Sequence, residues 1–307
     1  TQRESTGRNF VFAVISAFVA GAFFYLTLCR FGYPVQSVEY VAHGLGLNPF
    51  PGIRHTLWSR LLTLFVEYPH GSLAFKANLL SAVLGAVSVG LMAYVMACIR
   101  HDRSREEQVI QSRHGSAGLI SGGAAATFLT LSTPFWFIST RANPAALHAI
   151  LILVPIVLLL RFQQTSRFFW LLLMAMVYGI GATEYAILYL LLPFFTAYVL
   201  VALSRTELLT VRRVLAISFS GLLGYSFVVF AAWQFVRTDA ARWQGMDSLG
   251  EATFWFVKDQ ILSLIKSIPG SGWLLISVMC VIPWFLIMGI PLKGEARRTT
   301  PVFGSIF

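Results

Sequence analysis

Long apolar runs separated by short polar and basic segments dominate the chain. A helix needs about 20 apolar residues to cross about 30 Å of hydrocarbon, and runs near this length recur along most of the sequence. The break at 179–185, which contains two glycines, separates two of the shorter runs. The eight predicted spans are 10–29, 79–99, 117–137, 147–160, 168–180, 186–203, 214–236 and 273–290. This pattern predicts an all-α, polytopic membrane protein.

Two segments between predicted spans, 31–76 and 237–272, are too long to be simple turns. Apolar residues at helical spacing predict helices at 37–47 and 56–66, and a third amphipathic stretch follows at 254–266. We expect these helices to lie on the membrane surface.

Composition supports a membrane protein, because 57% of the residues are apolar, 12% are charged and the mean hydropathy is +0.72. A soluble domain of this size could not bury so much apolar surface in one core. The net charge of +10 would suggest nucleic acid in a soluble protein, but here the basic residues mark topology. Fourteen of the 23 Lys and Arg residues fall in the short segments on the side of the N-terminus, which places both termini in the cytoplasm. No nucleic-acid partner is predicted.

Five short motifs occur in a specific order along the first six predicted spans, which make up about two thirds of the chain. They read Gln36-Ser-Val-Glu39-Tyr40, Pro49-Phe-Pro51-Gly52, Lys76-Ala-Asn78-Leu-Leu-Ser81-Ala82, Ser132-Thr-Pro134-Phe-Trp136 and Gly179-Ile-Gly181. In this order they resemble the GT-C superfamily and, within it, a bacterial membrane family related to protein O-mannosyltransferases.

The resemblance implies a GT-C-like fold in a bacterial inner membrane and transfer of a sugar from a polyprenyl-phosphate carrier to an acceptor hydroxyl on the outer face. It implies no cofactor, since the sugar-lipid is a substrate, and membrane lipids are the expected partners. The predicted organisation is a single transmembrane domain over 1–307, with a GT-C-like core at 10–203, the last two spans within 214–292 and a short cytoplasmic tail at 293–307. Relatives of this type continue further, so we expect the chain to be a fragment of a longer protein.

The chain departs from the family pattern at three polar positions. Gln36 stands where the resemblance implies an aspartate that acts as general base, and a glutamine has no proton affinity near neutral pH. Asn143 and Ala145 replace an acidic and an aromatic residue, and the motif that begins at Pro49 lacks a histidine. These departures predict impaired or altered catalysis.

The candidate catalytic residues are Gln36, at the expected aspartate position, and Glu39, the remaining acid of the motif. The candidate substrate-binding residues are His43, Arg54, Arg60, Lys76, Arg141, Asn143 and Glu184. Gln36, Glu39 and His43 share one helix face, and such a face is more often simply the solvated side of an outer loop. The cations suit a lipid phosphate, although interfacial cations more often contact headgroups.

Glu184 lies at the glycine-containing break, where an ionisable group near the membrane normally faces protein or water. It is a candidate substrate contact or, equally, a structural group that caps the broken helix. No metal site is predicted, because Glu39 and His43 offer only two ligands, with His55 and Glu67 nearby in the sequence.

Two functions remain open from the sequence. In the first, the chain is a glycosyltransferase that uses a lipid-phosphate sugar donor, with Glu39 as the acid left to accept the proton. In the second, it is a non-catalytic, GT-C-derived scaffold or lipid-binding subunit with protein partners in a larger membrane complex.

Overall fold

A computed structural model describes residues 2–31, 36–45, 55–67, 70–98, 117–237, 241–242, 245–270, 272–273 and 277. This part of the chain contains helices, turns and bends but no strand. The helices are α1 Gln2–Leu26, α2 Gln36–Gly44, α3 Thr56–Val66, α4 Leu73–Cys98, α6 Ala117–Leu131, α7 Thr133–Ser139, α8 Ala145–Thr165, α9 Phe169–Glu184, α10 Ile187–Arg205, α11 Val211–Tyr225, α12 Phe227–Val236 and α14 Leu249–Ser267. The all-α prediction is confirmed for the described residues.

Five helical stretches in the described part of the chain are long and apolar enough to cross a membrane. They are Gly7–Leu26, Leu73–Cys98, Ala145–Thr165, Ile187–Arg205 and Val211–Val236. Two further predicted spans correspond to the shorter apolar helices α6 and α9, and the last predicted span lies almost entirely outside the described residues. The structure therefore supports a multi-pass membrane protein without reproducing the full predicted set of spans.

The predicted span at 117–137 is divided into α6 and α7. The chain leaves the helical conformation at Ser132, which has φ −66° and ψ 124°. Pro134 follows in the first turn of α7, where a missing N–H does no harm because that group has no partner within the helix. Apolar composition did not predict this boundary, because the run of mainly apolar residues continues from α6 into α7.

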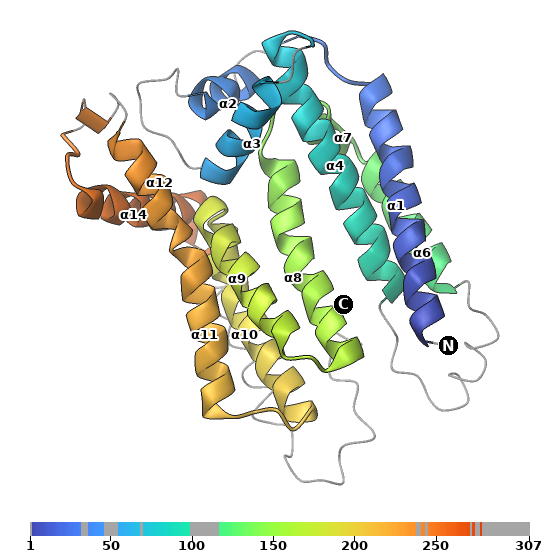
Figure 1. The fold of residues 1–307 in the computed structure, drawn as a ribbon. Coiled ribbons are helices and arrows are strands. Elements are labelled where there is room, and N and C mark those ends of the chain that lie inside the picture. Colours follow the sequence, from blue (N-terminus) through green and yellow to red (C-terminus); the bar gives the residue numbers. More distant parts are fainter. Residues whose placement is uncertain are drawn as a thin grey trace.

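The long helices run up and down between two ends of the molecule (Figure 1). The N-terminus lies at one end, and α2 and α3 gather at the opposite end, where α14 lies crosswise to α11 (Figure 1). Helices α2 and α3 form within the first long loop, and α14 forms within the second. The three helices predicted from amphipathic spacing are therefore present.

Small residues let neighbouring helices approach closely. Helix α1 packs along α4, where a Cβ added to Gly90 would lie only 2.9 Å from the Ala13 carbonyl oxygen. Helix α9 packs along α11, and a Cβ on Gly179 would overlap the Gly221 carbonyl oxygen and lie 2.7 Å from the Tyr225 amide nitrogen. Close packing through small residues is the usual way in which membrane helices associate.

Apolar side chains cover the outside of the bundle as well as its interior. Phe18 on α1 is 76% exposed and Phe219 on α11 is 68% exposed, and both belong to helices long enough to span a membrane. Water would make such a surface unfavourable, whereas lipid is as apolar as these side chains. The exposed pattern therefore fits a bundle surrounded by lipid.

Asn78, in the third motif, joins three parts of the chain inside the bundle. Its side-chain amide donates to the carbonyl oxygens of Cys29 at 2.6 Å and Phe31 at 3.2 Å, and its side-chain oxygen accepts from the Ala142 amide at 2.7 Å. One turn further along α4, the Ser81 hydroxyl accepts from the Asn143 amide at 3.0 Å. The third motif thus fixes the end of α1 and the turn before α8 against α4.

Replacing Gly179 by alanine should lower the free energy of unfolding by about 1–3 kcal/mol, the usual cost of overpacking. The opposing atoms belong to the α11 backbone, so they cannot turn aside as a flexible side chain would. Gly250→Ala in α14 is the matched control, because a Cβ added there would meet no atom within 4 Å and alanine favours helix. Thermal unfolding of both variants in the same detergent measures the difference, and equal midpoints would contradict the close α9–α11 contact.

Candidate functional site

A buried carboxylate caps the N-terminus of α3. Glu184 is 3% exposed, and it accepts hydrogen bonds from the Leu57 amide at 2.9 Å and the Trp58 amide at 3.2 Å. The first N–H groups of a helix have no partner within the helix and carry partial positive charge. His55, at the cap position of α3, provides no side-chain cap, so Glu184 supplies the missing acceptor from 126 or more residues away in the sequence.

The break after α9 places Glu184 where α3 begins. Helix α9 ends at Glu184 because Tyr185 is extended, with φ −138° and ψ 105°. The Tyr185 amide still donates to the Gly181 carbonyl oxygen at 2.8 Å, and α10 begins at Ile187. The helix is therefore interrupted at Tyr185, later than predicted, because Gly179 and Gly181 lie inside α9. Glu184 has the capping role that the sequence left open, with α3 rather than its own helix as the capped element.

Two histidine rings lie beside this carboxylate. His55 precedes α3, and His148 is in the first turn of α8. The His148 Nε2 atom is 3.3 Å from His55 Nδ1, and His55 Nδ1 is 3.7 Å from a Glu184 carboxylate oxygen. Tyr185 stacks on the His148 ring, with centroids 4.2 Å apart and planes 9° from parallel. The ligand-type atoms of His55, His148 and Glu184 lie within 4.8 Å of one another.

Helix α2 contacts this group through Tyr40. The Tyr40 ring meets His55 at a centroid distance of 5.8 Å and Trp58 at 6.2 Å, both nearly edge-on. Burial raises the pKa of Tyr40, and the neighbouring Glu39 carboxylate raises it further. Tyr40 therefore stays protonated at neutral pH.

Helix α14, in the segment 237–272, contacts the end of α9. Gln260 of α14 donates from its side-chain amide to the Thr183 carbonyl oxygen, and it accepts from the Tyr189 hydroxyl at 2.8 Å. The Tyr189 and Tyr225 hydroxyls are 2.9 Å apart. Helix α3, residues 183–189 at the end of α9 and the start of α10, and helix α14 therefore form one connected group. We call it the outer junction, after the side of the membrane on which the sequence predicts it.

Two of the predicted phosphate-binding cations have structural partners at α3, and their predicted phosphate-binding roles stay predictions. The Lys76 ammonium donates to the Val66 carbonyl oxygen at 2.7 Å, where the helix ends and its carbonyl groups carry partial negative charge. The Arg60 Nε donates to the Gln234 side-chain oxygen of α12 at 2.8 Å. Arg60 is exposed and Lys76 is half-buried, so both link elements of the outer junction and its surroundings.

Arg141 and Asn143 lie in the turn before α8. The Arg141 guanidinium carbon is 3.7 Å from the centroid of the Phe137 ring, a cation–π distance. The Asn143 side chain accepts from the Ala145 amide at 2.8 Å, which is a local turn typical of asparagine. These two candidate substrate contacts have structural partners in α7 and at the start of α8, and their predicted substrate roles stay predictions.

The remaining candidates belong to the first loop. Glu39 is exposed on α2. The backbone of Gln36 and His43 belongs to the same helix. The side chains of Gln36 and His43, and all of Arg54, lie outside the described residues. Their predicted roles therefore stay predictions.

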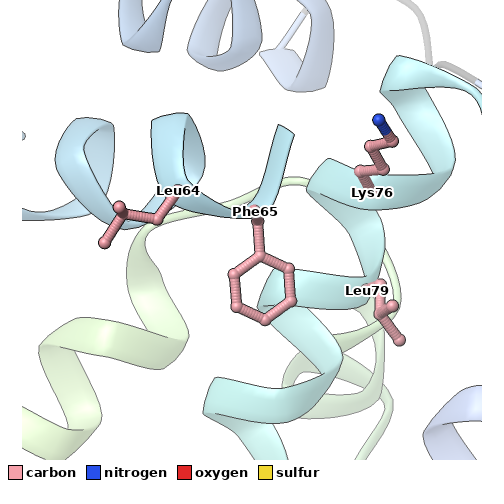
Figure 2. Close-up of a pocket in the computed structure, with 4 residues that line it drawn as sticks. All are labelled: Leu64, Phe65, Lys76 and Leu79. Atoms are coloured by element: carbon pink, nitrogen blue, oxygen red, sulfur yellow. The ribbon is translucent and has the colours of Figure 1, made fainter. Parts of the chain in front are cut away.

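Two cavities lie near these elements. One of about 280 Å³ is lined by Leu64, Phe65, Lys76 and Leu79, and Figure 2 shows the Phe65 ring between α3 and the first turns of α4. A larger, mainly apolar cavity of about 410 Å³ lies among α9, α10 and α11, with Tyr189 and Tyr225 in its wall. The Tyr189 hydroxyl also donates to Gln260, so the wall of this cavity borders the outer junction.

The sequence did not predict the convergence of His55 and His148 with Glu184. Along the chain His55 stands near Glu39 and His43, and His148 lies 93 residues further on. A signal existed, because an ionisable ring at the start of an apolar span normally faces protein rather than lipid. The pairing itself depends on how α3 packs against α8.

A family model for the N-terminal domain of the protein O-mannosyl-transferase TMEM260 matches residues 36–209. The match covers more than half of the chain. The chain belongs to this family. Comparison with curated proteins and with solved structures finds no significant match. The family segment contains α2 to α10 and therefore His55, His148 and Glu184, whereas α14 lies beyond it.

Replacing Glu184 by leucine should loosen α3, because two helix N–H groups lose their acceptor. Leaving buried donors unpaired costs about 1–3 kcal/mol each. Hydrogen exchange of segment 56–66 should become faster by more than tenfold, while exchange in α1 should stay unchanged. Glu251→Leu, which removes an exposed acid from the first turn of α14, is the control. Unchanged exchange in α3 would show that the Glu184 contact does not hold the helix.

Proposed function

We propose that the chain is a GT-C-like membrane protein that binds a polyprenyl-phosphate-linked sugar at the outer junction. Its membership of an O-mannosyl-transferase family supports this substrate class. The observation that carries the proposal is the convergence of three segments. The first loop contributes α3, the break contributes Glu184, and the last long loop contributes Gln260 of α14. We expect the substrate pocket of a transferase to lie among these segments.

The chemistry at this site is altered from that of an ordinary transferase. Gln36 cannot accept the acceptor proton, so Glu39 is the nearest acid in the motif. Glu39 is exposed beside Tyr40, whose ring packs against His55 at the edge of the junction. We assign Glu39 to the proton-accepting role in whatever transfer the chain performs, with a rate well below that of a relative that has aspartate at the Gln36 position.

The proposed orientation has both termini in the cytoplasm of a bacterial cell and the outer junction on the opposite face of the inner membrane. The distribution of Lys and Arg supports it. The described N-terminal end and the connections at 166–168 and 206–210 lie at the end of the bundle away from α2, α3 and α14 (Figure 1). Sugar-lipid would then reach the junction from the outer leaflet.

A second function is a non-catalytic scaffold or lipid-binding subunit of a membrane complex. The contrast between retained and changed motif residues favours it. Asn78 and Ser81 follow the family pattern and connect α4 to its neighbours, whereas Gln36 departs at the position of the chemistry. A protein that keeps the fold but not the catalytic activity would retain the packing residues and change the catalytic one.

Transfer of mannose from polyprenyl-phosphate-mannose to a serine- and threonine-containing peptide distinguishes the two functions. Gln36→Asp should raise the rate at least tenfold, because a positioned general base contributes about 10²–10⁴-fold, and Glu39→Gln should reduce the wild-type rate. Glu67→Gln, which neutralises an exposed acid at the end of α3, is the control and should leave transfer unchanged. If neither wild type nor Gln36→Asp transfers sugar, the transferase proposal fails.

Native mass spectrometry of the gently solubilised protein provides the complementary measurement. Bound sugar-lipid without protein partners would support the transferase. A stoichiometric protein complex without such lipid would instead support the scaffold.

A further inference from the structure

We propose that His55, His148 and Glu184 bind a divalent transition-metal ion of the zinc type. The three side chains come from the residue before α3, the first turn of α8 and the last residue of α9. The ligand-type atoms His55 Nδ1, His148 Nε2 and the Glu184 carboxylate oxygen lie within 4.8 Å of one another. Two imidazoles and one carboxylate form a ligand set that zinc sites use, with a fourth position left open for water or substrate.

The spacing between the histidines suits this ion. Ligands about 2.05 Å from a tetrahedral zinc ion lie about 3.3 Å from each other. The His55 Nδ1 and His148 Nε2 atoms are 3.3 Å apart, and His55 Nδ1 is 3.7 Å from the Glu184 oxygen. A shift of the carboxylate by a few tenths of an ångström completes the geometry on these two edges.

Charge balance is the second observation. The Glu184 side chain is fully buried, and a buried carboxylate is costly unless a positive charge or several hydrogen bonds compensate it. Its contacts within the described residues are two backbone amides and the His55 ring. Both ring atoms that face this centre are nitrogens able to act as lone-pair donors, so a cation bound between them would compensate the carboxylate directly.

The surroundings hold the three ligands in place. The Leu57 and Trp58 amides fix the Glu184 carboxylate, and the stacked Tyr185 ring fixes the plane of His148. Tyr40 packs edge-on against His55. Such contacts behind the ligands are typical of metal sites, where they orient each ligand before the ion binds.

A hydrogen bond between two neutral histidines is the competing explanation for the 3.3 Å distance. In that arrangement one ring nitrogen donates and the other accepts, so the pair completes a polar contact without an ion. The two explanations differ in one measurable property, because only the metal site takes up one ion per chain with an affinity that depends on both rings.

The metal site does not require sugar transfer, so it can be tested independently of the proposed function. Its open position would take water or an anionic oxygen such as that of a phosphate. An ion at this place would also tie α3, α8 and α9 together at the outer junction.

The test uses the full chain in detergent, stripped with a chelator and then titrated with Zn²⁺ or Co²⁺. We expect one ion per chain by elemental analysis and visible absorption bands characteristic of four- or five-coordinate cobalt. His55→Ala and His148→Ala should each weaken binding at least tenfold. His70→Ala, which removes an exposed histidine of the first loop, is the matched control and should bind as wild type does.

Thermal unfolding of the wild type keeps the test decisive if a histidine variant fails to fold. An ion that binds the native state raises the unfolding midpoint by mass action, so excess Zn²⁺ should stabilise wild type and His70→Ala alike. A wild-type chain with substoichiometric metal, no cobalt bands and no thermal shift would overturn the site. Equal binding by wild type and a folded His55→Ala, His148→Ala double variant would overturn it as well.

Discussion

The contact between the Glu184 carboxylate and the first turn of α3 is the interaction on which the outer junction depends. Helix α3 has 11 residues, which are too few for a helix to be stable alone in water. A negative side chain at its N-terminus and a positive side chain at its C-terminus complement the partial charges of its two ends. Glu184 meets the N-terminal amides, and the Lys76 ammonium meets the Val66 carbonyl group at the C-terminus. Burial of Trp58 and Leu62 against α4, α8 and α9 then holds the helix in a fixed position, which places His55 beside His148.

Close approach of the long helices makes this contact available. Glu184 can reach α3 only if α9 ends level with the start of α3. Gly179 and Gly224 have no side chains, and this lets α9 pack closely along α11. The Asn78 and Ser81 contacts fix the turn before α8, from whose first turn His148 extends. Two of the family motifs therefore act mainly on the frame of the bundle. The cluster of His55, His148 and Glu184 forms as a separate consequence of how these helices pack.

Family membership and the departure at Gln36 concern the same segment of the chain but different properties of it. The match to the TMEM260 N-terminal domain spans α2 to α10, so the frame of an O-mannosyltransferase-related membrane protein is present. The altered chemistry that we propose for the first loop rests on Gln36. His55, His148 and Glu184 lie in the same segment as that loop and the break, and a bound ion there would give the junction a positive centre that the sequence motifs do not predict.

Local sequence patterns predicted the helical class, the amphipathic helices of the two long loops and an interruption near Glu184. These features follow from hydrophobic length, from helical spacing and from the glycine-containing segment, all of which are local. Local patterns did not predict the division of 117–137, because α6 and α7 share one apolar composition and differ in the geometry at Ser132. The cap that Glu184 forms on α3 and the contact of His148 with His55 became visible only in the folded chain. Both are contacts between residues about 90 or more positions apart, and such pairings depend on how helices pack rather than on the residues beside each one.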